Sequence, residues 1–264
     1  MDIVPLGPGF SAELRGVTLA DVAADDAAYA AVRAAFEEHS VVVFRGQDVS
    51  DEVQIAFSRR FGPLEITKVG SRGVGTNLVI LTTIDENGKV VPPDHRFALR
   101  NKANQLWHTD STFKEVPALA SVLSARVIPA EGGETEYVST RLAFARLDPA
   151  LRQRLENSFA WHDYAHSRSK IAPGLATPVE RAALPPQCWR LVWKNPVNGR
   201  RALHRLARLW HRGNGRGRRA KTPRRTDRRG DRAGPQLRPH LAQRRRGHVG
   251  QPRHDASRPA VAGA

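Results

Sequence analysis

The stretch NQLWHTDSTF, residues 104–113, carries the pattern from which the fold and the chemistry are best read. His108 and Asp110 are two positions apart, so on an extended strand both side chains leave from the same face. One imidazole and one carboxylate there can occupy adjacent positions on a metal ion. A distant histidine would complete a two-histidine, one-carboxylate site of the kind that holds ferrous iron. The tripeptide alone leaves a second interpretation open, because a hydrogen-bonded surface pair gives the same pattern.

The sequence before this stretch predicts helices around one strand. Residues 27–39 are rich in strong helix formers with apolar residues at helical spacing, and Asp21 is a candidate cap for that helix. Residues 41–44 form a β-branched run typical of a buried strand. Ser50 is the expected N-cap of a second helix, which ends at Gly62-Pro63.

The sequence after residue 77 favours short strands. Residues 78–84 predict a strand, and Asn87-Gly88 predicts a tight hairpin turn. Residues 118–128 are again apolar and β-branched. A helical segment over residues 140–158 is divided in two by Asp148-Pro149. Helices first and many short strands later indicate an α+β protein built around a β-sandwich or barrel.

Length and composition limit the class of protein. The 264 residues, 40% hydrophobic, suffice for one cored domain, with or without an appendage. We find neither a long apolar run nor a basic start followed by an apolar block, so a soluble cytoplasmic protein with no membrane partner is expected. The single cysteine, Cys188, is expected to be a small buried apolar residue.

The positive charge is concentrated at one end of the chain. The formal net charge is +16, and residues 204–264 hold eighteen Lys and Arg against three Asp. The first 203 residues are therefore close to neutral. We predict two regions: a folded domain over residues 1–203 and a basic, disordered low-complexity tail over residues 204–264.

Several motifs of the first region occur in a recognisable order: VVVFRGQ (41–47), FSRRFGPLE (57–65), WHTDSTF (107–113), GGETEY (132–137) and CWRLVWKNPVNGRRAL (188–203). Together they resemble the taurine and 2,4-dichlorophenoxyacetate branch of the Fe(II)/2-oxoglutarate-dependent dioxygenases, over most of residues 10–203. The resemblance implies a double-stranded β-helix (jelly-roll) core with flanking helices. It also implies Fe(2+), 2-oxoglutarate as co-substrate, dioxygen and a small anionic substrate of the aryloxyalkanoate or sulfonate type.

The resemblance also assigns roles to residues. His108 and Asp110 match the first two iron ligands, and Thr135 matches the threonine that hydrogen-bonds the 2-oxoglutarate carboxylate. Asn104 occupies a place that often lines the substrate pocket, although a structural hydrogen bond would explain it equally well. The cations that could neutralise a substrate anion, or equally be solvated charges, are Lys68, Arg72 and Lys102.

Several other residues with suggestive side chains are interpreted as packing or loop residues rather than as metal ligands. Trp107 is expected to pack beside the metal and keep bulk water away. His162 and His166 could mimic a metal pair, but we interpret them as polar residues of a loop over the pocket. Arg168 and Lys170 belong to the same loop and could meet an anionic substrate.

The tail has the composition of a sequence translated out of frame. Residues 204–264 contain no Phe, Tyr, Ile, Glu or Met, and Arg, Gly, Pro and Ala dominate. A shifted reading frame takes the last two bases of each codon with the first base of the next. In that frame, possible codons for residues 248–256 can encode MWDNRATMH, and those for residues 203–215 can encode YIASHAYGIEGMD. Both strings resemble the carboxy-terminal sequence of the family, in which WDNR-x-x-x-H carries the distal iron histidine. Two matches in one register favour a frameshift.

The frameshift hypothesis predicts an impaired enzyme. The distal histidine and the family's arginine for the far carboxylate of 2-oxoglutarate would both be lost, along with the last strands of the jelly roll. The tail histidines lack the motif that would fix a substitute ligand; they are His204, His211, His240, His248 and His254. The leading hypothesis is therefore that the chain descends from an iron-dependent dioxygenase but has little or no turnover.

Two alternatives remain from the sequence. The arginine clusters of the tail would bind nucleic acid through phosphate contacts, without sequence preference, because no Phe or Tyr is interleaved for stacking. The chain could instead be a non-catalytic remnant or the product of a sequencing error. The oligomeric state and the exact substrate are not predicted.

Overall fold

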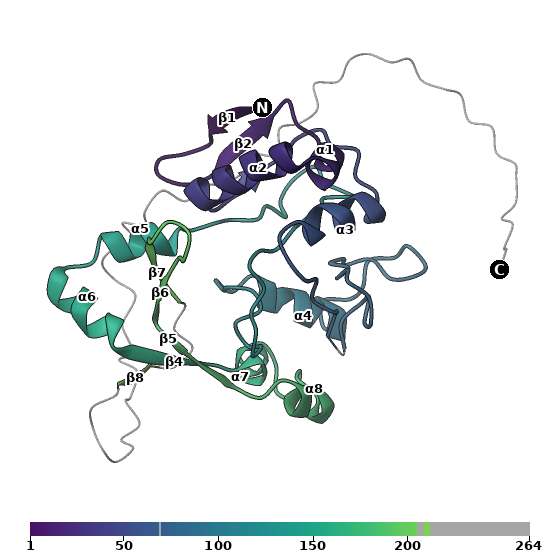
Figure 1. Ribbon diagram of the computed structural model, residues 1–264. Coiled ribbons are helices and arrows are strands. Elements are labelled where there is room, and N and C mark those ends of the chain that lie inside the picture. Colours follow the sequence, from purple (N-terminus) through teal and green to yellow (C-terminus); the bar gives the residue numbers. More distant parts are fainter. Residues whose placement is uncertain (69, 205–208, 212–264) are drawn as a thin grey trace, which may run out of the picture.

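A computed structural model describes residues 1–68, 70–204 and 209–211 of the chain. Its amino-terminal part is a small sheet in the order β1-β2-β3, formed by β1 (Asp2–Pro5), β2 (Ala12–Arg15) and β3 (Val42–Val43). β1 pairs antiparallel with β2, and β3 pairs parallel with it. Three helices gather beside this sheet, as Figure 1 shows in purple and blue: α1 (Leu19–Ala24), α2 (Asp26–His39) and α3 (Asp51–Arg59).

The first core lies between these helices and the sheet. Leu14 on β2, Val22 on α1, Val32 on α2 and Phe57 on α3 are all buried and in one apolar cluster. Each helix contributes one apolar stripe to this cluster, because residues three or four apart share a helical face. The helix expected over residues 27–39 is confirmed. The strand expected over residues 41–44 is present but only two residues long, and it is half-buried rather than buried.

Capping explains where these helices begin. Ser50 accepts a hydrogen bond from the backbone of Val53, which confirms it as the N-cap of α3. The prediction for Asp21 was wrong: it is the third residue of α1, where its carboxylate and Thr18 form a capping box. Asp25 caps α2 instead. The sequence after Thr18 breaks into two helices rather than one because Asp25 ends the first and begins the second.

The middle of the chain forms one helix, α4 (Arg96–Asn104), and otherwise irregular backbone. The expected turn at Asn87-Gly88 is present, with Asp85 and Lys89 joined by a backbone hydrogen bond of 2.8 Å. The strands predicted over residues 78–84 and 118–128 were wrong; only a single bridge, Ile84 to Val90, forms there. A strand needs a neighbour that pairs along its length, and the described residues give these stretches no pairing beyond that bridge.

The remaining elements form the second half of the molecule, with α5 and α6 at its edge (Figure 1). The helices are α5 (Thr140–Ala145), α6 (Pro149–Glu156), α7 (Tyr164–Ser169) and α8 (Pro178–Ala183). The strands are β4 (Ser158–His162), β5 (Gln187–Arg190), β6 (Val192–Lys194), β7 (Arg201–Leu203) and β8 (Leu209–His211). Asp148 caps α6 just before Pro149, so the predicted division of the helical segment is confirmed.

Two small antiparallel sheets organise this half. One has the order β5-β4-β8 and the other pairs β6 with β7. Strand β8 lies within the region for which we predicted no strand, and it pairs with β4 from Ser158 to Ala160. The residues beyond 211, where most of the expected basic tail falls, lie outside the described part of the chain. The division at residue 203 therefore stays a prediction.

The described residues thus form an α+β arrangement of helices and three small sheets. They do not close into the barrel that a complete jelly roll would form. In the same residues, no helix combines the length and the apolar character needed to cross a bilayer.

Candidate metal centre

The structure brings His108 and Asp110 together. Nε2 of His108 lies 3.2 Å from Oδ1 of Asp110. On the other side of the ring, Nδ1 lies 2.6 Å from the carbonyl oxygen of Leu106. A carbonyl and a carboxylate only accept hydrogen bonds, so Nδ1 donates to Leu106 and Nε2 donates to Asp110.

This arrangement has the donor geometry of two neighbouring ligands on one ion. Histidines that bind metals usually donate their other ring N–H to a carbonyl or carboxylate, and the Leu106 carbonyl fills that place. Two ligands at right angles, each about 2.1 Å from an ion, lie about 3 Å apart. The separation of His108 and Asp110 is close to that value, and an imidazole with a carboxylate suits ferrous iron. The residues present therefore fit half of an iron site.

Asp110 is held as a carboxylate. The hydrogen bond with His108 lowers the pKa of Asp110 most; burial opposes this, and a hydrogen bond from Ser121 adds to it. Ser121 donates to Oδ2 over 2.6 Å, leaving Oδ1 toward His108. Burial raises the pKa of Tyr137, and the nearby charge of Asp110 raises it further. Ser121 and Tyr137 were missed by the sequence analysis; the available signal was a serine, one of two, within the apolar run 118–128.

The backbone around the pair is a turn rather than the expected strand. Residues 107–109 are irregular and a turn begins at Asp110. Ser111, the next residue, is buried and has a φ of 59°. That left-handed conformation is uncommon for a residue with a side chain. The two ligands meet here through this turn and not through the alternation of a strand.

A third ligand is not found where the chain is described. Over residues 1–68, 70–204 and 209–211, no group of three His, Cys, Asp or Glu side chains is placed to hold one ion. The pair is also accessible, with 45% of the His108 side chain and 57% of the Asp110 side chain exposed. Four of the five tail histidines have no described side chain, and the fifth, His204, is discussed below.

The other predicted site residues lie in different settings. Thr135 is exposed, two residues before the Tyr137 that lies near Asp110. Lys102 and Asn104 are exposed residues at the end of α4, the helix that leads into the His108 segment. Their assigned contacts to 2-oxoglutarate and substrate stay predictions. Lys68 belongs to a separate network.

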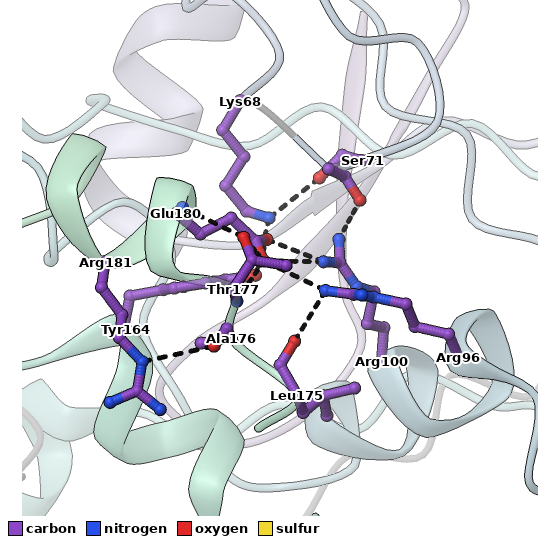
Figure 2. A network of polar contacts seen from close by, with 11 residues as sticks. Lys68, Ser71, Arg96, Arg100, Tyr164, Leu175, Ala176, Thr177, Glu180 and Arg181 are labelled. Carbon is purple, nitrogen blue, oxygen red and sulfur yellow. Dashed lines mark hydrogen bonds and ion pairs between the residues drawn. The ribbon is translucent and has the colours of Figure 1, made fainter. Parts of the chain in front are cut away.

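Figure 2 shows that network, which surrounds the carboxylate of Glu180. Glu180 is 1% exposed. Arg100 donates to both of its oxygens over 2.8 Å, and the hydroxyl of Tyr164 donates to Oε1 over 3.1 Å. Thr177 contributes a backbone and a side-chain donor and completes a capping box at the start of α8. Burial alone would raise the pKa of Glu180, but the hydrogen bonds from Thr177 and the charge of Arg100 outweigh it and the pKa is lowered.

Lys68 is attached to the edge of this network. Its Nζ donates to Ser71 Oγ and to Tyr164 Oη, both over 2.9 Å, and lies 4.5 Å from the centre of the Tyr164 ring. Both hydrogen-bond partners are neutral hydroxyls. Among the described residues no carboxylate contacts this ammonium directly, and the two hydroxyls orient it, unlike a freely solvated lysine.

Several ordinary interpretations need correction. Trp107 does not shield the pair, because 43% of it is exposed. Cys188 is exposed on β5, since its strand lies at the edge of a small sheet. Arg72 is bound to the carbonyl of Ile84 over 2.6 Å. His162 is a buried residue of β4 and His166 belongs to α7, so they share neither a loop nor a helix face.

Arg168 and Lys170 also differ from the loop that was expected. Arg168 lies on α7 with its guanidinium 4.6 Å from the centre of the Tyr164 ring, and Lys170 is the C-cap of that helix. Asp163 caps the same helix, which explains why the segment is helical.

His162 and His204 form a buried pair of rings, with centroids 5.4 Å apart. Burial lowers the pKa of His204 to about 4, and the neighbouring His162 adds to this. Burial also lowers the pKa of His162. Trp193 stacks on His204 at a centroid distance of 3.6 Å. Both imidazoles are therefore neutral in the folded protein at neutral pH.

This pair predicts a loss of stability in mild acid. The unfolded histidines gain protons below their ordinary pKa of 6.5, whereas folded His204 has a pKa of about 4 and the pKa of folded His162 is also lowered. The unfolded state is then favoured as the pH falls through this window, by on the order of 2 kcal/mol. Urea unfolding at pH 7.5 and pH 5 would measure this, with His204→Phe as a variant of reduced pH dependence. Equal stability of the wild-type chain at both values would contradict the prediction.

Comparison with known proteins identifies the family. The family model described as "Taurine catabolism dioxygenase TauD, TfdA family" matches residues 2–245. The chain belongs to this family. The resemblance inferred from the ordered motifs is thereby confirmed, and by its TauD/TfdA membership the chain is an enzyme of the dioxygenase class.

Two curated relatives illustrate the TauD/TfdA match. The alpha-ketoglutarate-dependent 2,4-dichlorophenoxyacetate dioxygenase of Cupriavidus pinatubonensis is 37% identical over 204 residues, which is 75% of this chain and 71% of the relative. The (S)-phenoxypropionate/alpha-ketoglutarate-dioxygenase of Sphingobium herbicidovorans is 38% identical over 172 residues, 64% of this chain and 56% of the relative. The chain thus spans between about half and seven tenths of these proteins.

Solved structures give the same family. AAD-2 in complex with Mn(II) and N-oxalylglycine has a TM-score of 0.69 and 32% identity, over 77% of this chain and 71% of that one. A taurine dioxygenase from Burkholderia xenovorans has a TM-score of 0.53 and 26% identity over the same share of this chain. N-oxalylglycine is an analogue of 2-oxoglutarate, so the expected pairing of a divalent metal with this co-substrate is confirmed for the family.

Proposed function

We propose that the chain derives from an Fe(II)- and 2-oxoglutarate-dependent dioxygenase that hydroxylates a small anionic organic substrate. The observation that carries this is the His108–Asp110 pair, with Nε2 and Oδ1 3.2 Å apart and Nδ1 bound to the Leu106 carbonyl. His108 and Asp110 would hold the iron, and Thr135 would bind a carboxylate of 2-oxoglutarate. The metal with its co-substrate supplies oxidising power that amino-acid side chains lack.

The protein residues would have positioning roles. The Leu106 carbonyl accepts from Nδ1 of His108, so Nε2 is the nitrogen that a metal would take, and its proton would leave as the ion binds. Ser121 holds one oxygen of Asp110, so that the other remains directed at His108. These two contacts would fix the orientation of both ligands before an ion arrives.

The setting of Lys68 favours an anionic substrate. A cavity of about 280 Å³ is lined by Lys68 and Lys114, by Thr67 and Glu180, and by the apolar side chains of Ile66, Ala183 and Leu184. The Glu180 carboxylate is already paired with Arg100. Lys114, also in the lining, is paired with Glu65 over 2.5 Å, whereas Lys68 contacts only hydroxyls among the contacts given above. A cation beside apolar walls suits a molecule with one anionic group and a hydrophobic body. This favours the aryloxyalkanoate type, for which Lys102 and Asn104 would be further contacts.

We further propose that the iron site of this chain is only half complete. The WDNR-x-x-x-H motif is absent from the sequence as it stands, but residues 248–256 permit it in another reading frame. The apolar stretches 78–84 and 118–128 support the same view. Val79, Ile80, Leu81, Leu119 and Leu123 are each more than half exposed, as expected where a sheet has lost its covering strands.

The proposal treats residues 1–203 as the inherited dioxygenase region and residues 204–264 as out-of-frame translation. The arginine-rich tail would then bind nucleic acid only incidentally and weakly, through phosphate contacts that added salt removes. We expect the remaining catalytic activity to be small, because an iron site with two protein ligands holds the metal loosely.

Metal titration tests the half-site. We expect the wild-type chain to bind Mn(II) weakly, and His108→Ala to lower that affinity at least about tenfold, because one of two protein ligands is removed. Calorimetric titration of the metal-free full chain measures both. His166→Ala, which removes a histidine of α7, serves as the matched control and should leave the affinity unchanged. Equal Mn(II) binding by wild type and His108→Ala would refute the assignment.

A further inference from the structure

Thr112 is hydrogen-bonded to residues of two neighbouring strands. Its hydroxyl is hydrogen-bonded to Nδ1 of His162 on β4, over 2.8 Å. Its carbonyl oxygen accepts a hydrogen bond of 2.7 Å from the indole Nε1 of Trp189 on β5. β4 and β5 are antiparallel neighbours, with Ala160 opposite Trp189. Two adjacent strands therefore hold one residue that lies only two positions after Asp110.

The residue between Asp110 and Thr112 explains why these two hydrogen bonds matter for the backbone conformation. Ser111 is 8% exposed and has a φ of 59°. A left-handed residue that is not glycine costs free energy and persists only where its surroundings impose it. The hydrogen bonds to Thr112 hold the chain immediately after Ser111, and so fix the turn that directs Asp110 toward His108.

His162 is an unusual residue for a purely structural position. It is 6% exposed, and its Nε2 is buried without a hydrogen-bond partner among the described residues. A buried unsatisfied nitrogen costs free energy, so packing alone would favour an apolar ring. The contact that the imidazole makes and an apolar ring could not make is the one to Thr112.

We propose that His162 and Trp189 are positioning residues for the metal pair, acting through Thr112 and the turn at Ser111. Neither side chain touches the ion. Together they set the direction of Asp110 relative to His108 before metal binds. This inference rests on the proposed function, since it presumes that the pair is a metal site, but its consequence for the geometry of His108 can be observed without metal.

The metal-free readout is the hydrogen bonding of the His108 ring. With the turn intact, Nδ1 donates to the Leu106 carbonyl and Nε2 donates to the Asp110 carboxylate, so both ring nitrogens should show the ¹⁵N shifts of hydrogen-bonded N–H groups. Thr112→Val keeps the shape of the side chain but removes the hydroxyl. We expect Asp110 to move away from His108 in this variant, and the His108 shifts to move toward the averaged values of an imidazole that exchanges between its two tautomers. His162→Phe should do the same, and His162→Asn, whose amide reaches the position of Nδ1, should restore the wild-type spectrum.

The second readout is Mn(II) affinity by calorimetry on the full chain. Thr112→Val and Trp189→Phe should each weaken binding by about ten- to a hundredfold, the usual effect of losing a residue that orients a ligand. Ser158→Ala is the matched control. It removes a buried hydroxyl of β4, the strand that carries His162, which donates to the backbone carbonyl of Arg154 on α6, and it should lower stability without changing the His108 spectrum.

The outcomes separate the two proposals. Unchanged ¹⁵N shifts of His108 in folded Thr112→Val would overturn the positioning role, whatever the metal affinity. A changed spectrum together with a wild-type chain that binds no Mn(II) would support the positioning role and refute the metal site. Equal changes in Ser158→Ala and Thr112→Val would also overturn it, because the effect would then follow from stability alone.

Discussion

Replacing Glu180 with alanine is expected to lower the free energy of unfolding by about 3–5 kcal/mol, the usual cost of removing one partner of a buried ion pair. Glu180 is 1% exposed, and Arg100, itself 12% exposed, donates to both carboxylate oxygens. Without Glu180 the guanidinium would stay buried with its main anionic partner gone. The same change removes the capping box with Thr177 at the start of α8. Urea unfolding at pH 7 measures the loss.

A matched exposed pair provides the control. Arg200 also donates to both oxygens of a carboxylate, that of Glu38, but both side chains are well exposed, at 39% and 58%. Glu38→Ala should therefore cost about 1 kcal/mol or less, because water solvates the partner that remains. If Glu180→Ala cost no more than Glu38→Ala, the network in Figure 2 would not be the buried, mutually dependent cluster that the contacts indicate.

Restoring the other reading frame after residue 203 is expected to have the largest effect on function. The restored chain would carry the WDNR-x-x-x-H histidine as third ligand and the strands that complete the sheet. Turnover should then rise from background into the ordinary range for enzymes, about 1–1000 per second. Succinate formation with 2-oxoglutarate and an aryloxyalkanoate measures it. A restored chain that folds but makes no succinate would contradict the frameshift account.

The restored chain should also bury its exposed apolar stretches. Leu81 and Leu123 are 56% and 59% exposed, in segments whose alternating or continuous apolar character is typical of sheet interiors. Amide hydrogen exchange over residues 78–84 and 118–128 should slow markedly once strands pair with them. His108→Ala in the restored chain is the inactive control, since it removes one ligand.

The sequence predicted best what local chemistry decides. Helices over residues 27–39 and 51–59 follow from apolar spacing and from caps such as Ser50, and the break at Asp148-Pro149 follows from proline geometry. The His108–Asp110 pair was also predicted, because two residues so close in sequence lie near each other in the fold. The conformation that joins them was not, because a turn with left-handed Ser111 has no sequence signal as clear as glycine.

Most of the failures depend on contacts between distant segments. Residues 78–84 have the composition of a strand, but in the described part of the chain Ile84 alone has a bridge partner, Val90, and a strand needs pairing along its length. Asp21 is a local exception, because its capping role depends on Thr18 three residues before it. Glu180 and His162 are buried by tertiary packing, which no local sequence pattern indicates. Neither the carboxylate network nor the hydrogen bonds to Thr112 could therefore be predicted.

The central claim is that this chain kept two iron ligands, His108 and Asp110, and lost the third. Anaerobic titration of the chain with Fe(II) in the presence of 2-oxoglutarate, followed by admission of air and assay of succinate, tests it most directly. The account predicts weak Fe(II) binding that depends on His108, with succinate at or near background. Tight, stoichiometric Fe(II) binding followed by rapid succinate formation would contradict it.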